Sequence, residues 1–140
     1  MKVLIPFDGS EASQSALHYV LKSAKNHRSL DITILTVVCN EAPFARDFVA
    51  NPTEALNACQ DFFRGSLEKA KALFDAEGIQ VSTLMKSGDA AEVIISTVEE
   101  QGFDKVIMGR RGLSSLTGWV LGSVSAKVLN NVDVPVTLVK

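Results

Sequence analysis

Five short apolar runs, alternating with amphipathic stretches, constrain the fold of this 140-residue chain more than any other feature. The first run, residues 2–7, is nearly continuous Val-Leu-Ile, which is typical of a strand covered on both faces of a parallel sheet. Parallel strands need crossover connections, and these are right-handed, so strand–helix alternation predicts a doubly wound α/β domain. We expect the five strands at residues 2–7, 31–38, 79–85, 105–108 and 134–139.

Four helices are predicted between these strands. Ser10 is a good N-cap for the first and Asp89 for the third, while Gly78 and Gly102 suit the ends of the second and third. The second helix covers about residues 53–77, and we expect its apolar residues to cover the sheet: Ala55, Cys59, Phe62, Phe63, Leu67, Ala70 and Phe74. The last covers about residues 121–130, with four residues inward: Leu121, Val124, Val128 and Leu129.

Composition excludes several classes of protein. Hydrophobic residues make up 46% of the chain and charged residues 21%, which fits one folded domain. The net charge of −2 gives no indication of electrostatic binding to nucleic acid or membrane. No targeting or membrane-spanning segment is visible, and Cys39 and Cys59 have no metal-ligand or redox spacing. We therefore expect a cytoplasmic protein with free thiols that pack as small apolar side chains.

Residues 104–125 have the pattern of a phosphate-binding segment. The apolar strand 106–108 meets Gly109, continues through Arg110, Arg111 and Gly112, and reaches Gly122-Ser123, where a helix is expected to begin. A helix start carries unpaired N–H groups and partial positive charge, and glycines allow an anion to approach the backbone. The alternative is that the glycines only close a turn and cap a helix.

This spacing, G-x2-G-x9-G-[ST], resembles that of the ATP-binding universal stress proteins, and the resemblance covers the whole chain. It implies one universal stress protein domain over residues 1–140, with the adenine nucleotide alpha hydrolase-like fold and strand order 3-2-1-4-5. That order places a topological switch point between the first and fourth strands, where open α/β sheets bind ligands. Asp8 and Gly109 are then expected to face one crevice.

The resemblance implies that ATP, with Mg²⁺, binds in that crevice. Val37, Val38 and Met108 would border the adenine, and the hydroxyls of Ser123 and Ser125 would donate to the phosphates. Asp8 is a metal-side carboxylate that acts indirectly, and it also suits an Asx-turn before the first helix. The full set of expected site residues is Pro6, Asp8, Val37, Val38, Met108, Gly109, Arg111, Gly112, Gly122, Ser123, Val124 and Ser125.

Efficient ATP hydrolysis is not expected. Phosphoryl transfer needs a held metal, a positioned nucleophile and neutralised charge, yet the loop has no lysine and no second acid accompanies Asp8. Arg110 and Arg111 either pair with phosphate or are solvated. We assign no catalytic residue, and expect slow ATPase activity at most in a protein that acts in the stress response.

Three other classes were weighed. A two-component receiver needs a phospho-accepting aspartate at the end of the third strand, where this chain has Met85-Lys86-Ser87. A flavodoxin-like electron carrier needs a hydroxyl-rich phosphate loop after the first strand, and Asp8-Gly9-Ser10 offers too few hydroxyl groups for that loop. The alternative left open is a nucleotide-independent dimeric adaptor in which the glycine loop is purely structural.

The final strand predicts a homodimer. It is apolar on both faces and lies at a sheet edge, which invites pairing with a second copy, although Pro135 deletes one donor. The resembling family commonly dimerises through this strand. Residues 39–52 are expected to form a long connection, which is either a lid, a partner surface or a passive loop. Trp119 is expected either to pack its own loop against the domain or to contact a partner.

Overall fold

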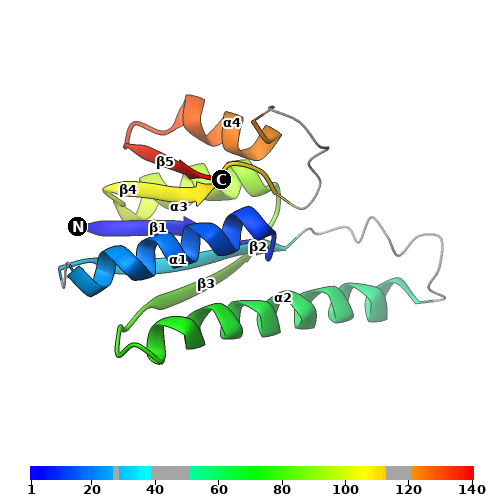
Figure 1. The fold of residues 1–140 in the computed structure, drawn as a ribbon. Helices are drawn as coiled ribbons and strands as arrows, with labels where there is room; N and C mark the ends of the chain where they lie inside the picture. The colour runs from blue at the N-terminus through cyan, green and yellow to red at the C-terminus, as the bar shows by residue number, and fades with distance from the viewer. Residues whose placement is uncertain (27–28, 39–50, 113–120) are drawn as a thin grey trace.

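A computed structural model describes residues 1–26, 29–38, 51–112 and 121–140. Strands and helices alternate along the chain (Figure 1). The elements are β1 (Lys2–Pro6), α1 (Glu11–Asn26), β2 (Asp31–Val38), α2 (Pro52–Asp75), β3 (Ser82–Ser87), α3 (Ala90–Gln101), β4 (Lys105–Gly109), α4 (Ser123–Asn131) and β5 (Val136–Val139). Trp119, Cys39, His27 and most of the 39–52 connection lie outside the described residues.

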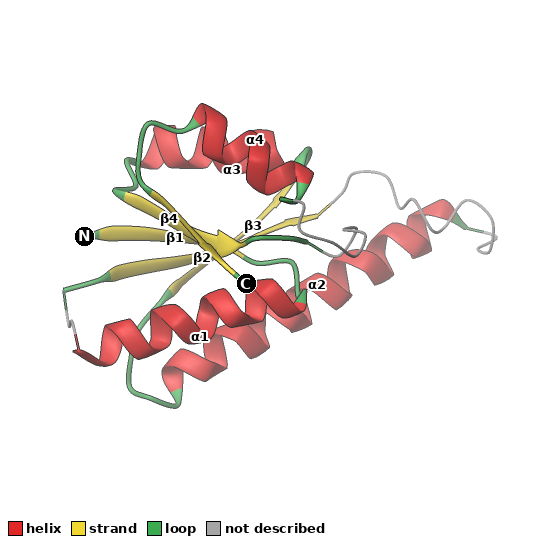
Figure 2. Ribbon diagram, turned by 45° about the horizontal axis from the view of Figure 1, so that its top comes forward, coloured by secondary structure: helices red, strands yellow, loops and turns green. Residues whose placement is uncertain are grey.

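The five strands form one parallel sheet in the order β3-β2-β1-β4-β5, which confirms the predicted fold class and strand order. Helices α1 and α2 cover one face and α3 and α4 the other (Figure 2). Strand β1 lies at the centre, paired with β2 on one side and β4 on the other. Because all strands run the same way, their carboxyl ends meet at one edge of the sheet.

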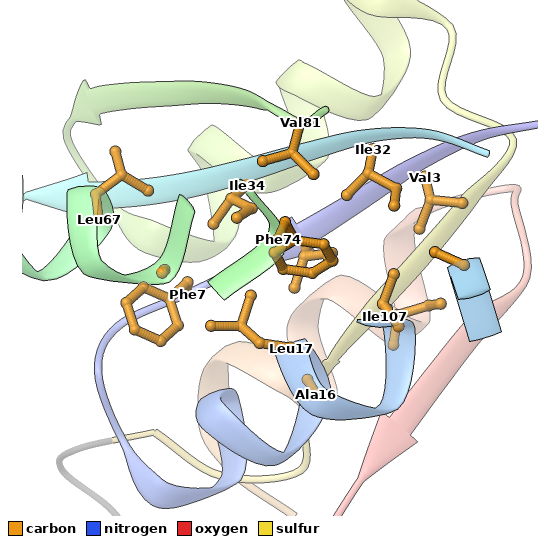
Figure 3. Close-up of a cluster of buried hydrophobic side chains, with 14 residues drawn as sticks. Val3, Phe7, Ala16, Leu17, Ile32, Ile34, Leu67, Phe74, Val81 and Ile107 are labelled. Carbon is orange, nitrogen blue, oxygen red and sulfur yellow. The ribbon is translucent and has the colours of Figure 1, made fainter. Parts of the chain in front are cut away.

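Successive side chains of the central strands enter opposite cores. Val3 and Ile5 pack in the cluster beneath α1 and α2, together with Phe74 of α2 (Figure 3), whereas Leu4 packs in the cluster beneath α3 and α4. The alternation follows from the two-residue repeat of a strand. A strand with a core on each face needs apolar residues at consecutive positions, which explains the continuous run in β1.

Side-chain caps begin three of the four helices. The hydroxyl of Ser10 accepts a hydrogen bond from Ser13 N (3.2 Å), Asn51 Oδ1 from Thr53 N (3.0 Å) and Asp89 Oδ1 from Glu92 N (3.0 Å). The predicted caps at Ser10 and Asp89 are confirmed. Helix α4 differs, because its N-cap residue is Gly122, which has no side chain to accept a hydrogen bond from the first turn. Within the described residues, α4 therefore begins without the side-chain cap that the other helices have.

The predicted bounds of the third strand and the end of the preceding helix were wrong. The strand runs from Ser82 to Ser87 rather than over 79–85, because pairing with β2 begins only at Thr33 opposite Ser82. Ile79 instead donates its N–H to Phe74 O (3.0 Å) and closes the end of α2. The C-cap of α2 is Ala76, and Gly78, with φ of 70°, follows in the turn.

Two apolar residues predicted to face inward are exposed. Phe62 is 67% exposed, because the N-terminal half of α2 extends beyond the sheet (Figures 1 and 2). Leu129 is 43% exposed on α4. Helical periodicity identifies a stripe of residues, but the length of sheet available to cover it is a tertiary property.

Strand β5 begins at Val136, two residues later than predicted. Its open edge also loses no hydrogen-bond donor to Pro135, contrary to the prediction. Val106 N donates to Pro135 O (3.0 Å) and Arg110 N donates to Val139 O (2.7 Å), so Pro135 and Val139 direct their backbone groups toward β4. Alternation then turns the backbone groups of Val136 and Leu138 to the open edge. The donor that Pro135 lacks is on the β4 side, so it removes nothing from that edge.

Among the helices of the described part of the chain, none combines the length and the hydropathy needed to cross a membrane.

Two phenylalanines on α2 test the placement of this helix. Phe74 is fully buried in the core, so Phe74→Ala is expected to lower the free energy of unfolding by about 3–5 kcal/mol. Phe62→Ala is the matched control, and its loss should stay within about 0.5 kcal/mol because the side chain is exposed. Urea denaturation measures both, and equal losses would contradict the projection of α2 beyond the sheet.

Candidate functional site

The predicted site residues gather at the carboxyl edge of the sheet. Pro6 ends β1, Val38 ends β2 and Gly109 ends β4, and these three strands are neighbours with β1 between the others. Asp8 lies two residues beyond the end of β1 and is half-buried. The edge is also the topological switch point, since the helix that follows β1, α1, lies on one face and the helix that follows β4, α4, lies on the other.

Asp8 lies against the glycine loop. Its Oδ1 accepts a hydrogen bond from Ser10 N (2.9 Å), which confirms the predicted Asx-turn. A Cβ placed on Gly112 would lie 2.7 Å from Asp8 Oδ2, so residue 112 can carry no side chain without displacing the carboxylate. Two segments far apart in the sequence therefore meet at this edge.

Gly109 provides a close contact between β4 and α1. A Cβ at this position would lie 2.7 Å from Ala12 C and 2.8 Å from Ser13 N, both backbone atoms. Backbone atoms of a buried helix cannot move aside as the end of a flexible side chain can. Glycine at 109 is therefore required for the first turn of α1 to pack on the end of β4.

Gly122 brings the start of α4 back onto the residues that follow β4. Its N–H donates to Arg110 O (3.0 Å), and a Cβ there would lie 3.2 Å from Arg111 Cα. Ser123, the next residue, is exposed. The uncapped start of α4 thus lies directly beside the segment Arg110–Gly112.

Ser125 has a role that the motif did not indicate. Its side chain is only 2% exposed, and its hydroxyl donates to Gly109 O (3.0 Å). The hydrogen bond fastens the first turn of α4 to the end of β4. The sequence predicts that this hydroxyl donates to phosphate, as that of Ser123 would, but in the structure it donates to the backbone of Gly109.

The apolar members of the predicted set divide between the faces of the sheet. Val37, Met108 and Val124 belong to one apolar cluster, beneath α3 and α4. Val38, next to Val37 on β2, is buried, and by alternation it points to the opposite face. The structure therefore brings Val37, Met108 and Val124 together and leaves Val38 to the other side.

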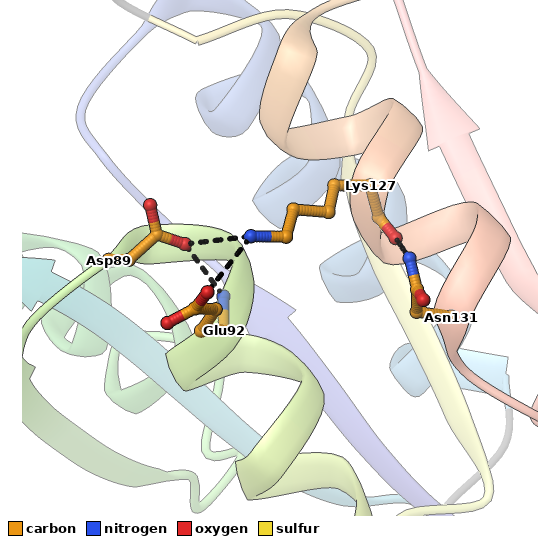
Figure 4. Close-up of polar contacts among 4 residues, drawn as sticks. All are labelled: Asp89, Glu92, Lys127 and Asn131. Carbon is orange, nitrogen blue, oxygen red and sulfur yellow. Dashed lines mark hydrogen bonds and ion pairs between the residues drawn. The ribbon is translucent and has the colours of Figure 1, made fainter.

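An exposed polar network links α4 to the start of α3 (Figure 4). Lys127 Nζ lies 3.2 Å from Glu92 Oε1 and 3.6 Å from Asp89 Oδ1. The hydrogen bond from Glu92 N, with smaller help from Lys127, lowers the pKa of Asp89, while the bond to Glu92 raises the pKa of Lys127. The sequence analysis missed this pairing, because only the tertiary structure brings α4 to these acids.

The donor set for a metal ion is small. Within the described ranges, no three His, Cys, Asp or Glu side chains gather as ligands for a cation. Asp8 is a single carboxylate whose Oδ1 already accepts a hydrogen bond from Ser10. A magnesium ion near Asp8 would need most of its oxygen ligands from nucleotide phosphates and water, which is its usual manner of binding.

The arrangement defines a doubly wound α/β protein whose glycine loop lies at its switch point. The model of the universal stress protein family matches residues 1–140, and the chain belongs to that family. It is 32% identical over 137 residues to Universal stress protein Sll1654 of Synechocystis sp., covering 98% of this chain and 83% of that protein.

Two solved structures share the fold. Universal stress protein MJ0577 of Methanocaldococcus jannaschii superposes with a TM-score of 0.86 at 28% identity, covering 99% of this chain and 94% of that one. A universal stress protein family protein from Arabidopsis thaliana, solved with AMP bound, has a TM-score of 0.70 at 21% identity, covering 100% and 91%. The second likeness shows the fold alone.

Two glycine substitutions test the contact between β4 and α1. Gly109→Ala is expected to lower the free energy of unfolding by about 1–3 kcal/mol, because the new methyl group would overlap backbone atoms of α1. Gly65→Ala, within α2, should instead raise it by about 0.5–1 kcal/mol, because a Cβ there has no heavy atom within 4 Å. Chemical denaturation measures both, and a neutral Gly109→Ala would contradict the tight packing.

Proposed function

We propose that this universal stress protein binds ATP, with Mg²⁺, in the crevice at the carboxyl edge of its sheet. It acts in the stress response as a cytoplasmic, regulatory homodimer that holds the nucleotide and hydrolyses it slowly or not at all. The proposed binding residues are those expected from the sequence, from Pro6 and Asp8 to the G-x2-G-x9-G-S motif.

The start of α4 is the observation that carries this proposal. Of the four helices, α4 alone lacks a side-chain cap in the described part of the chain, and its N-cap is a glycine. A phosphate placed there would accept hydrogen bonds from the N–H groups of the first turn and gain from the helix dipole. Exposed Ser123 would add its hydroxyl. Ser125 would contribute its backbone, since its hydroxyl holds α4 to β4.

Adenine is the base that we propose for this crevice. Val37 and Met108 offer apolar surface at strand ends on either side of β1, as a nucleobase requires. AMP bound to the Arabidopsis relative supports an adenine nucleotide as the ligand. The complete G-x2-G-x9-G-S motif, with glycines at three positions and a serine after the last, favours a ligand with several phosphates.

Slow hydrolysis follows from the same residues. Asp8 is a carboxylate in contact with the glycine loop at Gly112, and one of its oxygens is bonded to Ser10 N. The loop supplies two arginines but no lysine. Without a positioned base for water, charge stabilisation alone gives little phosphoryl transfer.

Titration calorimetry of nucleotide-stripped protein with ATP and Mg²⁺ tests the binding. Gly122→Val should abolish binding, since its side chain would press on the backbone of Arg110–Gly112 and displace the glycine loop. Exposed Ser123→Ala should weaken binding about tenfold by removing one donor. Ser23→Ala is the control, because Ser23 lies near the other end of α1, where its hydroxyl donates to Tyr19 O (3.0 Å).

Absence of ATP binding by folded wild-type protein would overturn the proposal. The nucleotide-independent dimeric adaptor would then be the better explanation of the glycine loop. Circular dichroism of each variant separates loss of a binding contact from loss of the fold.

The open edge of β5 supports the homodimer. All four residues of β5 are half-buried in the single chain, and the outward backbone groups of Val136 and Leu138 are suited to pairing with a second copy. Strand pairing across an edge also covers the apolar side chains at that edge. Isologous contact of β5 with its own copy is therefore the proposed interface.

A lysine at the edge tests this interface. Thr137→Lys is expected to convert the dimer to a monomer, because charge on an edge strand opposes strand pairing, and Thr137 belongs to neither buried cluster. Thr83→Lys on β3, at the other edge of the sheet, should leave the mass unchanged. Sedimentation equilibrium gives the mass. A wild-type monomer at all concentrations would refute the dimer.

A further inference from the structure

A cavity of about 420 Å³ opens on the α1 side of the carboxyl edge. It lies between the first turns of α1, the segment that follows β4 and residue 140. Its lining residues are Ser10, Glu11, Ala12, Ser15, Arg110, Arg111, Gly112 and Lys140. The apolar surface proposed for adenine belongs to the opposite face, beneath α3 and α4, so this cavity is a different part of the edge.

The cavity concentrates positive charge in a protein whose net charge is −2. Arg110, Arg111 and Lys140 line it, and Glu11 has the one acidic side chain among the described lining residues. No salt bridge of the described residues involves any of these four side chains. Three cations that converge from two segments, without an internal counter-charge bonded to them, create a local field that attracts anions.

Both arginines have a buried guanidinium nitrogen, unlike arginines that are fully solvated at a protein surface. Nε of Arg110 and Nε of Arg111 are buried and, in the described part of the protein, have no hydrogen-bond acceptor. Leaving a buried donor without a partner costs roughly 1–3 kcal/mol, more when the donor is charged. An anion in the cavity would supply the acceptors, so this arrangement is better suited to a bound anion than to solvated side chains.

We propose that this cavity binds a phosphate group through Arg110, Arg111 and Lys140. Guanidinium groups pair with phosphate oxygens through two parallel hydrogen bonds, and three cations match the charge of a phosphate dianion. The half-buried hydroxyl of Ser15 lines the same cavity. The proposal extends beyond the residues of the proposed nucleotide site, since Lys140 and Ser15 lie outside the glycine motif and Arg110 occupies one of the two variable positions between Gly109 and Gly112.

The phosphate has two possible sources. Arg111 and Gly112 line this cavity and also belong to the proposed nucleotide site, so the terminal phosphates of a bound nucleotide are one source. Free phosphate or pyrophosphate is the other. Both have the same chemistry, and competition distinguishes them.

Titration of the full chain with inorganic pyrophosphate, by calorimetry, tests the site. Arg110→Gln and Lys140→Gln should each weaken binding at least tenfold, while Glu11→Gln should tighten it several-fold by removing the one acid. Arg64→Gln is the matched control, because Arg64 pairs with Asp61 on α2 and does not line the cavity. Thermal melts of each variant establish that it folds.

Repeating the titration with saturating ATP separates the two sources. Competition identifies the nucleotide's own phosphates as the ligand, and simultaneous binding identifies a second anion; either supports the site. Unchanged binding in folded Arg110→Gln and Lys140→Gln, or no pyrophosphate binding by the wild type, would overturn it. Pyrophosphate binding without ATP binding would refute the proposed function alone, and ATP binding without pyrophosphate binding would refute this inference alone.

Discussion

The close contact of Gly109 with the first turn of α1 is the constraint on which the rest of the carboxyl edge depends. Because no side chain separates them, β4 and α1 approach to backbone contact at the switch point. The segment Arg110–Gly112 then leaves β4 directly above the start of α1, where Asp8 meets Gly112. A larger residue at position 109 would push these elements apart, and with them the walls of both the crevice and the basic cavity.

Two interactions hold α4 in its orientation. Ser125 bonds the first turn of α4 to Gly109 O, and Lys127, further along the helix, reaches the acids that begin α3. A buried hydrogen bond and an exposed ion pair thus hold one helix at two points. Its first turn, which has glycine at the N-cap, lies beside the segment Arg110–Gly112. Preorganised donors bind an anion without having to be ordered at the moment of binding.

The short segment after β4 contributes both to the proposed nucleotide site and to the basic cavity. Residues Arg111 and Gly112 belong to the motif beside α4 and also line the cavity beside α1. A ligand on either side therefore contacts backbone that the other side uses. The proposed β5 dimer would place this segment near a second copy, because Arg110 N is bonded to Val139 O at the end of β5.

The sequence by itself determined the order of the elements, the sheet topology through its family pattern, and the caps at Ser10 and Asp89, because periodicity and capping act over a few residues. It did not determine the start of β3, the exposure of Phe62 or the engagement of the Ser125 hydroxyl. These depend on which residues of distant segments come into contact. The convergence of Arg110, Arg111 and Lys140 has the same cause: only the completed sheet brings the end of β4, the chain around residue 140 and the start of α1 to one edge.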